Sequence, residues 1–399
     1  MHSPPTASAE HEGRNLYVDL LRGVSILVVL LLHYTLAYKL ASSPLLQWAP
    51  APILHTLFYN GNYGVSVFFV ISGFLITSNI VKRYGSLGRI DVAHFYKLRF
   101  FRLYPLTVLA LVMITVLGLA GLSKFSNVVH HANPGNGFFV VADLSVLTFW
   151  HNILMERVGY FNYAMNIYWS LSVEEVFYLL YPLALLVLRR GWLLAALAGL
   201  CLVAGPLYRG LHRDDELFFM YGNLACVDML AYGCIAAIVA SRLTLSQAAR
   251  KGLAVLACIA MAWIYMRGIS GNEALGATYM GVAAAVFLVT VSRLPAGAIS
   301  RRLGAPLAWL GQHSYEIYLF HIVVLGLLLQ LVPRAALADD WKLPVLVVFV
   351  AVAAATAWIA ARFCGDPLNR WLRSRYARKG SNATDAAISS SRSQVGTGG

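Results

Sequence analysis

Charged residues are scarce in this sequence. Asp, Glu, Lys and Arg make up only 12% of the 399 residues, whereas a soluble globular domain carries about 25%. Hydrophobic residues account for 59%, and the mean hydropathy is +0.66. This balance excludes an ordinary soluble enzyme. It predicts an integral membrane protein with many spans of roughly 20 residues.

The sequence also shows no cysteine pairs, no signal-peptide pattern in its first residues and no internal repeats. Its five cysteines lie in or beside apolar runs and form no C-x-x-C pair, so we expect buried thiols and neither a disulfide framework nor a metal site. Residues 1–15 are polar and do not show the charged, apolar and small-residue order of a signal peptide. The missing repeat counts against a transporter built from two related halves.

Ten apolar segments predict an all-α polytopic membrane protein with about ten transmembrane helices. The stretch 138–154 is short and contains Asp143, His151 and Asn152, so we expect a re-entrant segment or a loop helix there. The ten predicted spans are residues 18–40, 64–82, 103–122, 172–188, 192–208, 220–241, 252–267, 274–292, 314–333 and 343–362.

The basic residues predict the orientation of these spans. With the N-terminus inside, 22 of the 31 Lys and Arg residues fall in cytoplasmic segments and 7 outside, and Arg22 and Lys39 lie within the first span. This bias follows the positive-inside rule, so the net charge of +13 needs no nucleic-acid partner. We expect a cytoplasmic N-terminus (1–15), one membrane domain (16–365) without an attached soluble catalytic domain, and a basic, then disordered, cytoplasmic tail (366–399).

Arg22 and His33 stand out in the first apolar segment. Eleven residues of helix turn by about 1100°, so the two side chains share one helix face, on the order of 16 Å apart along the axis. Charged and titratable groups in a span usually face a cavity or a pathway. His33 can serve there as general base or as nucleophile. The alternative is a snorkelling Arg and an interhelical His.

Arg99 and Arg102 are three residues apart and therefore share a helix face. We expect Asp91 to cap a short interfacial helix that runs from Val92 toward Pro105. Guanidinium groups bind phosphate in a bidentate manner, so the pair can form a phosphate clamp. The alternative is ordinary cytoplasmic positive charge that contacts lipid phosphates.

Two carboxylates, Glu174 and Glu175, stand at the start of the fourth predicted span. We predict that Ser172, Glu175 and Tyr178 form one polar stripe facing the cavity, that Glu175 partners His33, and that Glu174 faces a loop or solvent. The rival interpretation is a capping box, in which Ser172 and Glu175 only close the helix N-terminus.

Two further signals are weaker. Asp228 is an acid within the sixth predicted span, which favours a functional or paired role. Tyr315, Tyr318 and His321 recur at every third position in the ninth span. A satisfied interhelical histidine explains His321 as well as a substrate contact does.

Five motifs in this order resemble the acyltransferase-3 family of bacterial membrane acyltransferases, over residues 17–365. Two positions depart from the family pattern, because Ser66 replaces a frequent acid and Cys226 a frequent Arg two residues before Asp228. The motifs are Arg22-x10-His33, the Gly64–Thr77 segment, Arg99-x-x-Arg102 followed by Tyr104-Pro105, the Trp169–Tyr178 segment and the Tyr315–His321 segment.

The resemblance implies an O-acyltransferase of the bacterial cytoplasmic membrane that uses acyl-CoA, usually acetyl-CoA, and a hydroxyl of an envelope carbohydrate. We expect catalytic roles for His33, Glu174 and Glu175, and donor binding by Arg22, Arg99 and Arg102. We expect acceptor binding by Asp228, Tyr178, His321 and Trp169.

Two alternatives stay open, an acyltransferase for a small secondary metabolite such as a macrolide and a proton-coupled transporter. The acceptor, the acyl chain length, the oligomeric state and the choice between base and acyl carrier for His33 also stay open.

Overall fold

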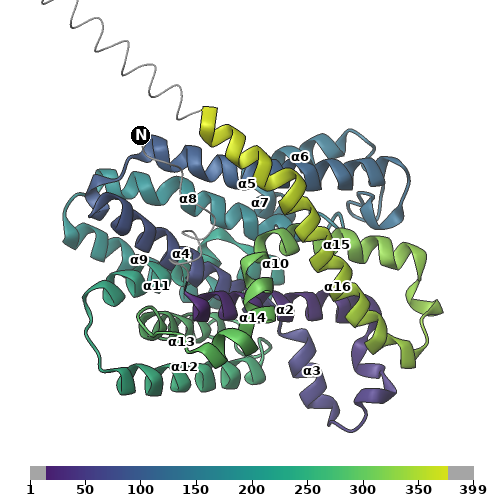
Figure 1. The fold of residues 1–399 in the computed structure, drawn as a ribbon. Helices are drawn as coiled ribbons and strands as arrows, with labels where there is room; N and C mark the ends of the chain where they lie inside the picture. The colour runs from purple at the N-terminus through teal and green to yellow at the C-terminus, as the bar shows by residue number, and fades with distance from the viewer. Residues whose placement is uncertain (1–14, 376–399) are drawn as a thin grey trace, which may run out of the picture.

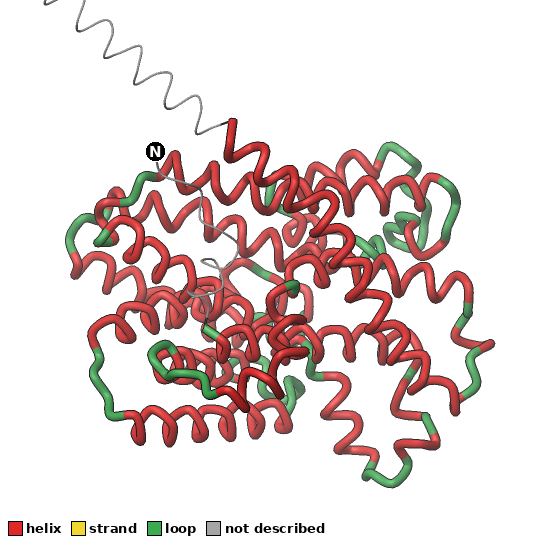
Figure 2. Tube along the Cα trace, viewed as in Figure 1, coloured by secondary structure: helices red, strands yellow, loops and turns green. Residues whose placement is uncertain are grey.

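The fold is a bundle of helices. The computed structural model describes residues 15–375, and within this range it contains no β-strand (Figure 2). Figure 1 shows most of the long helices running in a similar direction. The helices are α2 (Leu16–Tyr38), α3 (Ala51–Tyr59), α4 (Asn62–Tyr84), α5 (Val92–Leu119), α6 (Phe138–Leu147), α7 (His151–Val158), α8 (Trp169–Val187), α9 (Gly191–Leu211), α10 (Glu216–Tyr221), α11 (Asn223–Arg242), α12 (Gln247–Arg267), α13 (Gly276–Val291), α14 (Ala298–Gln312), α15 (Ser314–Leu331) and α16 (Lys342–Ala360).

Between residues 15 and 375, nine helical stretches are long and apolar enough to cross a membrane. This confirms the prediction of an all-α polytopic membrane protein. The predicted span 274–292 forms α13, which has 16 residues and is shorter than the roughly 20 that a bilayer core requires. α13 is instead packed against α11, α12 and α4.

The stretch 138–154 is not a single span. It forms the two short helices α6 and α7, separated by a turn in which Phe149 has a φ of 67°. This agrees with the expected loop helix. The sequence analysis did not predict α14, an additional helix that packs along α2.

α5 is one continuous helix. Its first turn is capped by Asp91, whose Oδ1 accepts a hydrogen bond from the backbone N–H of His94 at 2.9 Å. Pro105 lies inside the helix without ending it. The interfacial helix and the third span of the sequence analysis are therefore a single 28-residue element, and Arg99 and Arg102 lie about two turns and one turn before Pro105, respectively.

α2 lies between α14, α4 and α15, and α4 in turn packs most extensively against α11. Small residues permit this second contact. A Cβ at Gly73 would overlap the carbonyl oxygen of Leu230, and one at Gly233 would overlap that of Val70. The two backbones therefore touch, as small residues at membrane helix interfaces allow.

The last helix extends beyond the predicted membrane domain. After α16 the chain makes one π-helical segment, Ala361–Gly365, and then continues as α-helix to Arg375. Figure 1 shows this yellow helix crossing the bundle diagonally beside α5. Residues 366–375, predicted as part of the tail, are thus helical, while the rest of the predicted tail and residues 1–14 lie outside the described residues.

Candidate functional site

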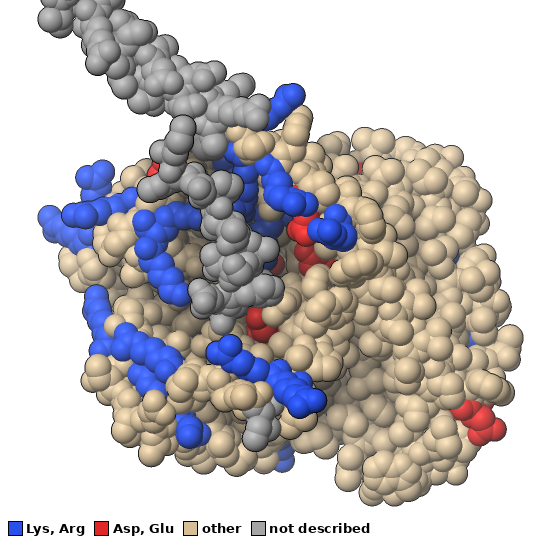
Figure 3. Space-filling model, viewed as in Figure 1, with Lys and Arg blue, Asp and Glu red and all other residues tan. Residues whose placement is uncertain are grey.

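A cavity of about 560 Å³ opens between α4, α5, α8 and α15. Its size falls within the range typical of small-molecule sites. Figure 3 shows Lys and Arg side chains gathered over the left and upper parts of one face, with few on the right. Within residues 15–375, the charged residues that line the cavity are six cations and one acid, namely Arg22, Lys82, Arg83, Arg99, Arg102, Arg373 and Glu174.

Arg22 reaches this cavity from α2. Its Nε and Nη2 both donate to the hydroxyl of Ser314, at 3.2 and 2.9 Å. Ser314 is the first residue of α15, so the guanidinium is held between two helices. Arg22 thus lines the cavity as predicted, whereas His33, which was predicted to share that cavity, does not line it.

Arg99 lies over the ring of Tyr178, with 3.8 Å between its guanidinium carbon and the ring centroid. The aromatic face attracts the cation and fixes its position. Arg102 lines the same cavity from the next turn of α5. The two arginines therefore share a face that borders the cavity, as their spacing predicts.

Glu174, and not Glu175, lines the cavity. Its Oε1 accepts a hydrogen bond from the hydroxyl of Ser72 on α4, and the Tyr178 hydroxyl donates to Ser72 at 3.2 Å. The prediction that Glu174 faces a loop or solvent is therefore wrong. Tyr178 is four residues from Glu174, about 40° around the helix, and about 60° from Glu175 on the other side. The cavity-facing stripe follows Ser170, Glu174 and Tyr178.

Glu175 is buried, and its Oε1 has no hydrogen-bond partner among the described residues. The capping-box interpretation is also wrong, because α8 begins at Trp169 and Ser172 is already inside it. The Ser172 hydroxyl accepts a hydrogen bond from the backbone N–H of His151 at 3.2 Å. α8 starts earlier than predicted because a 3₁₀ turn, Asn166–Tyr168, leads directly into it.

His33 meets His321 instead of Glu175. The two ring centroids are 5.1 Å apart, with the planes tilted by 47°. The Nδ1–H of His321 donates to the main-chain oxygen of Tyr318 at 2.8 Å, because a carbonyl can only accept. Nε2 of His321 is buried and has no partner within the described part of the chain. The predicted pairing of Glu175 with His33 is therefore replaced by a pair of imidazoles.

Tyr318 connects the cavity to this pair. Its ring lines the cavity and lies 5.7 Å from the His321 ring, centroid to centroid. Its hydroxyl is 2.6 Å from that of Ser170 and donates to the main-chain oxygen of Ile167 at 2.8 Å. The rings of Tyr318, His321 and His33 thus form a series that leads away from the cavity.

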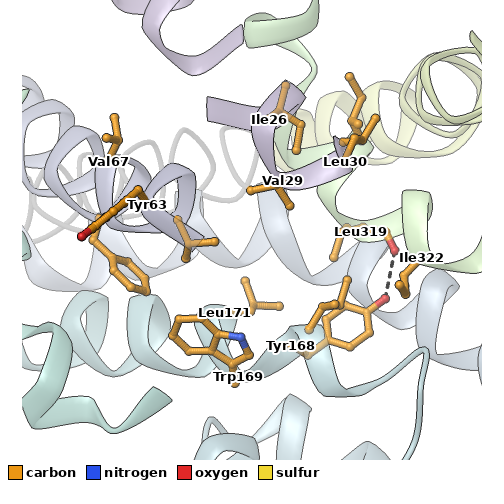
Figure 4. Packing of buried hydrophobic residues seen from close by; sticks show 14 of the residues in the cluster. Ile26, Val29, Leu30, Tyr63, Val67, Tyr168, Trp169, Leu171, Leu319 and Ile322 are labelled. Carbon is orange, nitrogen blue, oxygen red and sulfur yellow. Dashed lines mark hydrogen bonds between the residues drawn. The ribbon is translucent and has the colours of Figure 1, made fainter. Parts of the chain in front are cut away.

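Apolar side chains fill the space beside this series. Figure 4 shows Val29 of α2 above Leu171 of α8, and Leu319 of α15 close to Tyr168. The hydroxyl of Tyr168 donates to the main-chain oxygen of Leu319 at 3.1 Å. These side chains belong to the main hydrophobic core of the bundle.

Asp228 is not at the cavity. Its carboxylate forms a bidentate ion pair with Arg209 of α9, with distances of 2.9 and 2.8 Å, and also accepts a hydrogen bond from Thr278 at 2.7 Å. Both charged side chains are almost fully buried. No oxygen of Asp228 remains open to a ligand, so the expected acceptor contact is replaced by a structural ion pair.

Trp169 lies at a second, smaller cavity of about 40 Å³ at the other end of α4, where Asn62 and Arg209 also line the wall. Phe69 borders both cavities. Trp169 packs edge-on against Phe69, with 5.9 Å between ring centroids. It is therefore separated from the cationic cavity, which the sequence could not show.

The sequence analysis missed several lining residues. Ser72 belongs to the Gly64–Thr77 motif, but the sequence analysis gave it no role, and its hydroxyl donates to the carboxylate of Glu174. Lys82 and Arg83 were counted only as topology signals. Arg373 was assigned to the tail, because its apolar helix was expected to end at residue 362.

Comparison with known proteins places these residues in a family. The family model described as an acyltransferase domain matches residues 15–362. The chain is 28% identical to the O-acetyltransferase OatA of Staphylococcus aureus (strain NCTC 8325 / PS 47) over 292 residues, which cover 66% of this chain and 46% of that protein.

Two more relatives show the same partial coverage. The putative peptidoglycan O-acetyltransferase YrhL of Bacillus subtilis is 28% identical over 67% of this chain and 45% of its own length. The peptidoglycan O-acetyltransferase OatA of Listeria monocytogenes is 26% identical, with coverages of 78% and 49%. The chain thus spans about half the length of these relatives, and no solved structure shows a significant match. Since the family model covers most of its length, the chain belongs to the acyltransferase-3 family of membrane proteins.

Proposed function

We propose that this protein transfers an acyl group, acetyl in the first instance, from cytoplasmic acyl-CoA to a hydroxyl of an envelope carbohydrate. The observation that carries the proposal is the cavity, whose described lining has six cationic side chains and one acid. A ligand that fits such a lining carries several negative charges, and guanidinium groups favour phosphate. The three phosphates of CoA meet this requirement.

The donor is proposed to enter with its thioester first. Arg99, Arg102 and Arg22 then contact the phosphates and the inner part of the ligand. The pantetheine portion is extended and largely uncharged, which suits the inner wall formed by Val65, Phe69 and other apolar residues. The nucleotide remains at the cationic mouth, which we place on the cytoplasmic side.

His33 is the proposed base or acyl carrier. As a base it removes the proton of the acceptor hydroxyl, whose oxygen attacks the thioester carbonyl carbon. The carbon–sulfur bond breaks and the thiol leaves with a proton. As a carrier, a His33 ring nitrogen attacks first and the acceptor oxygen displaces it. His321 is a positioning residue in both cases, because its Nδ1–H is engaged by Tyr318 and its Nε2 is left to accept.

The carbohydrate acceptor is proposed from the relatives, two of which are named as peptidoglycan O-acetyltransferases, one of these putatively. The acceptor would approach from the end of the bundle opposite the cationic mouth. Trp169 lies at that end, and an aromatic face is a suitable surface for a sugar ring. The bacterial cytoplasmic membrane is the proposed location, since it separates cytoplasmic CoA from envelope glycans.

The test is reconstitution of the purified protein in vesicles with acetyl-CoA labelled in its acetyl group. Peptidoglycan fragments are supplied on the side opposite the donor, and labelled ester is measured by mass spectrometry. We expect label on the fragments with the parent protein. His33→Ala, at matched expression and folding, should lower the rate by about 10²–10⁴-fold, the usual contribution of a positioned base.

Other outcomes would contradict the proposal. Near-normal transfer by His33→Ala would remove His33 from the chemistry. Transfer only to a small secondary metabolite would replace the acceptor. Uptake of intact substrate that depends on a proton gradient, without ester formation, would instead identify a transporter.

A further inference from the structure

The structure assigns the C-terminal helix to the donor site. We propose that Arg373, carried by the helix that continues α16 after Gly365, binds the outermost phosphate of a polyphosphorylated ligand. This inference rests on the proposed function, where that group is the 3′-phosphate of acyl-CoA. It adds a segment that the sequence analysis placed in the tail.

The helix is directed to the cavity by its π-helical segment. Gly365 ends this segment and packs closely against Leu106 of α5, where a Cβ would come within 2.9 Å of the Leu106 side chain. π-Helical segments are rare and frequently occur at functional sites. Eight further residues, roughly 12 Å of helix, separate Gly365 from Arg373.

Arg373 then lines the same cavity as the last turn of α4 and the first half of α5. Its Nε donates to the side-chain oxygen of Asn369 at 2.9 Å, one turn earlier. This bond orients the guanidinium along the helix. Lys82 and Arg83 of α4 line the cavity too, so cations from three separate helices meet at one mouth.

The positions of the cations along the cavity indicate which phosphate of the ligand each cation contacts. Arg22 is held at Ser314 and Arg99 lies over the ring of Tyr178, so both contact the helices of the bundle, and we place them deeper in the cavity than Arg373. Arg373 lies on the final helical turns described. A ligand that enters with its thioester first leaves its 3′-phosphoadenosine end at the mouth. Arg373 therefore faces that end, and the arginines of α5 face the pyrophosphate.

The charge pattern also favours an anionic ligand. Like charges gathered at one mouth repel each other, and Glu174 is the one acid in the lining among the described residues. A helix that adds a further Arg to such a mouth is favoured once a polyanion is present. Both nucleotide phosphates and anionic lipid headgroups have this chemistry, so the experiment separates the two.

The same helix offers matched controls. Arg370 and Arg375 are exposed and do not line the cavity. The Nε of Arg370 donates to the main-chain oxygen of Asp366 at 3.3 Å, and Arg375 lies over the Trp371 ring. Replacing either by Ala changes the net charge of the helix as much as Arg373→Ala does.

The experiment measures the affinity of the purified full chain for CoA and for 3′-dephospho-CoA in nanodiscs of phosphatidylcholine, which supplies no net anionic headgroup. We expect Arg373→Ala to weaken CoA binding about 10-fold or more, as loss of a charged hydrogen bond does. Binding of dephospho-CoA should be unchanged by the substitution. Arg370→Ala and Arg375→Ala should bind both ligands like the parent.

Equal CoA affinity of the parent and Arg373→Ala would overturn the inference while leaving the donor assignment intact. An equal loss for both ligands would also overturn it, because Arg373 would then serve a different group. If the parent does not bind CoA at all, the proposed donor fails. Pyrophosphate is the probe in that case, and weaker pyrophosphate binding by Arg373→Ala would still support a phosphate contact. An effect seen only in phosphatidylglycerol nanodiscs would assign Arg373 to lipid.

Discussion

The His33 ring of α2 faces the His321 ring of α15 at a centroid distance of 5.1 Å. A backbone carbonyl engages the Nδ1–H of His321, so the other ring nitrogen can only accept. In a catalytic pair of this kind one residue acts as the base and the second orients it, and the two histidines are arranged in this way. The partner is a second imidazole, and the expected carboxylate of Glu175 is elsewhere.

The role of His321 can be tested by substitution. His321→Ala removes the acceptor beside His33, so the rate constant for transfer should fall by roughly 10² or more while donor affinity stays close to that of the parent. His321→Gln retains an acceptor and should recover part of the rate. The measurement is the pH dependence of the single-turnover rate.

A purely structural His321 would give a different result. Activity would then fall by the same factor at every pH, and loss of activity would follow loss of thermal stability. A displaced limb of the pH profile in a well-folded variant is the signature of positioning.

The arginines of α5 should set donor affinity. Arg99→Lys keeps the charge but loses the planar fork and the contact with the Tyr178 ring, so acetyl-CoA binding should weaken. Arg102→Ala should weaken it further, by about 10–100-fold. Affinity should also fall with added salt, because part of the attraction is between charges. Titration of the protein in detergent at two salt concentrations measures both effects.

Arg89 supplies the control for this pair. It is exposed on the same end of the bundle and does not line the cavity. Arg89→Ala should bind acetyl-CoA like the parent. If Arg99→Lys and Arg102→Ala also do so, the α5 arginines are topology signals only.

Glu174 and Glu175 allow a matched comparison within one turn. Glu174→Gln removes the charge that accepts from Ser72 and faces six cations, so donor affinity should change and transfer should slow. Glu175→Gln removes a buried carboxylate whose Oε1 has no described partner, and it should affect transfer less than Glu174→Gln does. Transfer rates and melting temperatures of both variants show which of the two carboxylates contributes to transfer. A larger loss of transfer in a stable Glu175→Gln would restore the original assignment.

The ion pair of Arg209 and Asp228 should govern stability. Removal of either partner leaves a buried charge without compensation, at a cost of about 3–5 kcal/mol. Arg209→Met with Asp228→Leu removes both charges and should be less destabilised than the sum of the single changes. Thermal unfolding in detergent measures this. Additive losses would mean that the two side chains act independently.

The helical spans could be predicted from the sequence, and so could the orientation of Arg22 toward the cavity. Both depend on local periodicity. The face of α8 that lines the cavity could not be predicted, because the helix start at Trp169 depends on the preceding 3₁₀ turn. A shift of three residues moved Ser172 from the cap into the helix. The apolar run also concealed how far the last helix continues past residue 362.

Contacts between side chains of distant helices also could not be predicted from the sequence. Arg209 and His321 find their partners Asp228 and His33 across packed interfaces, and no spacing along one helix reveals such contacts. The candidate residues were mostly found by type, and their partners were assigned incorrectly. Polar groups in spans identify a site more reliably than they identify its geometry.

The glycine contact between α4 and α11 has a mechanical consequence for the cavity. Because the two backbones touch at Gly73 and Gly233, this pair has no free space for tilting or sliding. α4 therefore forms the stationary wall of the cavity. We therefore expect any rearrangement that accompanies ligand binding to occur on the opposite side, where α5 and the C-terminal helix meet at Gly365.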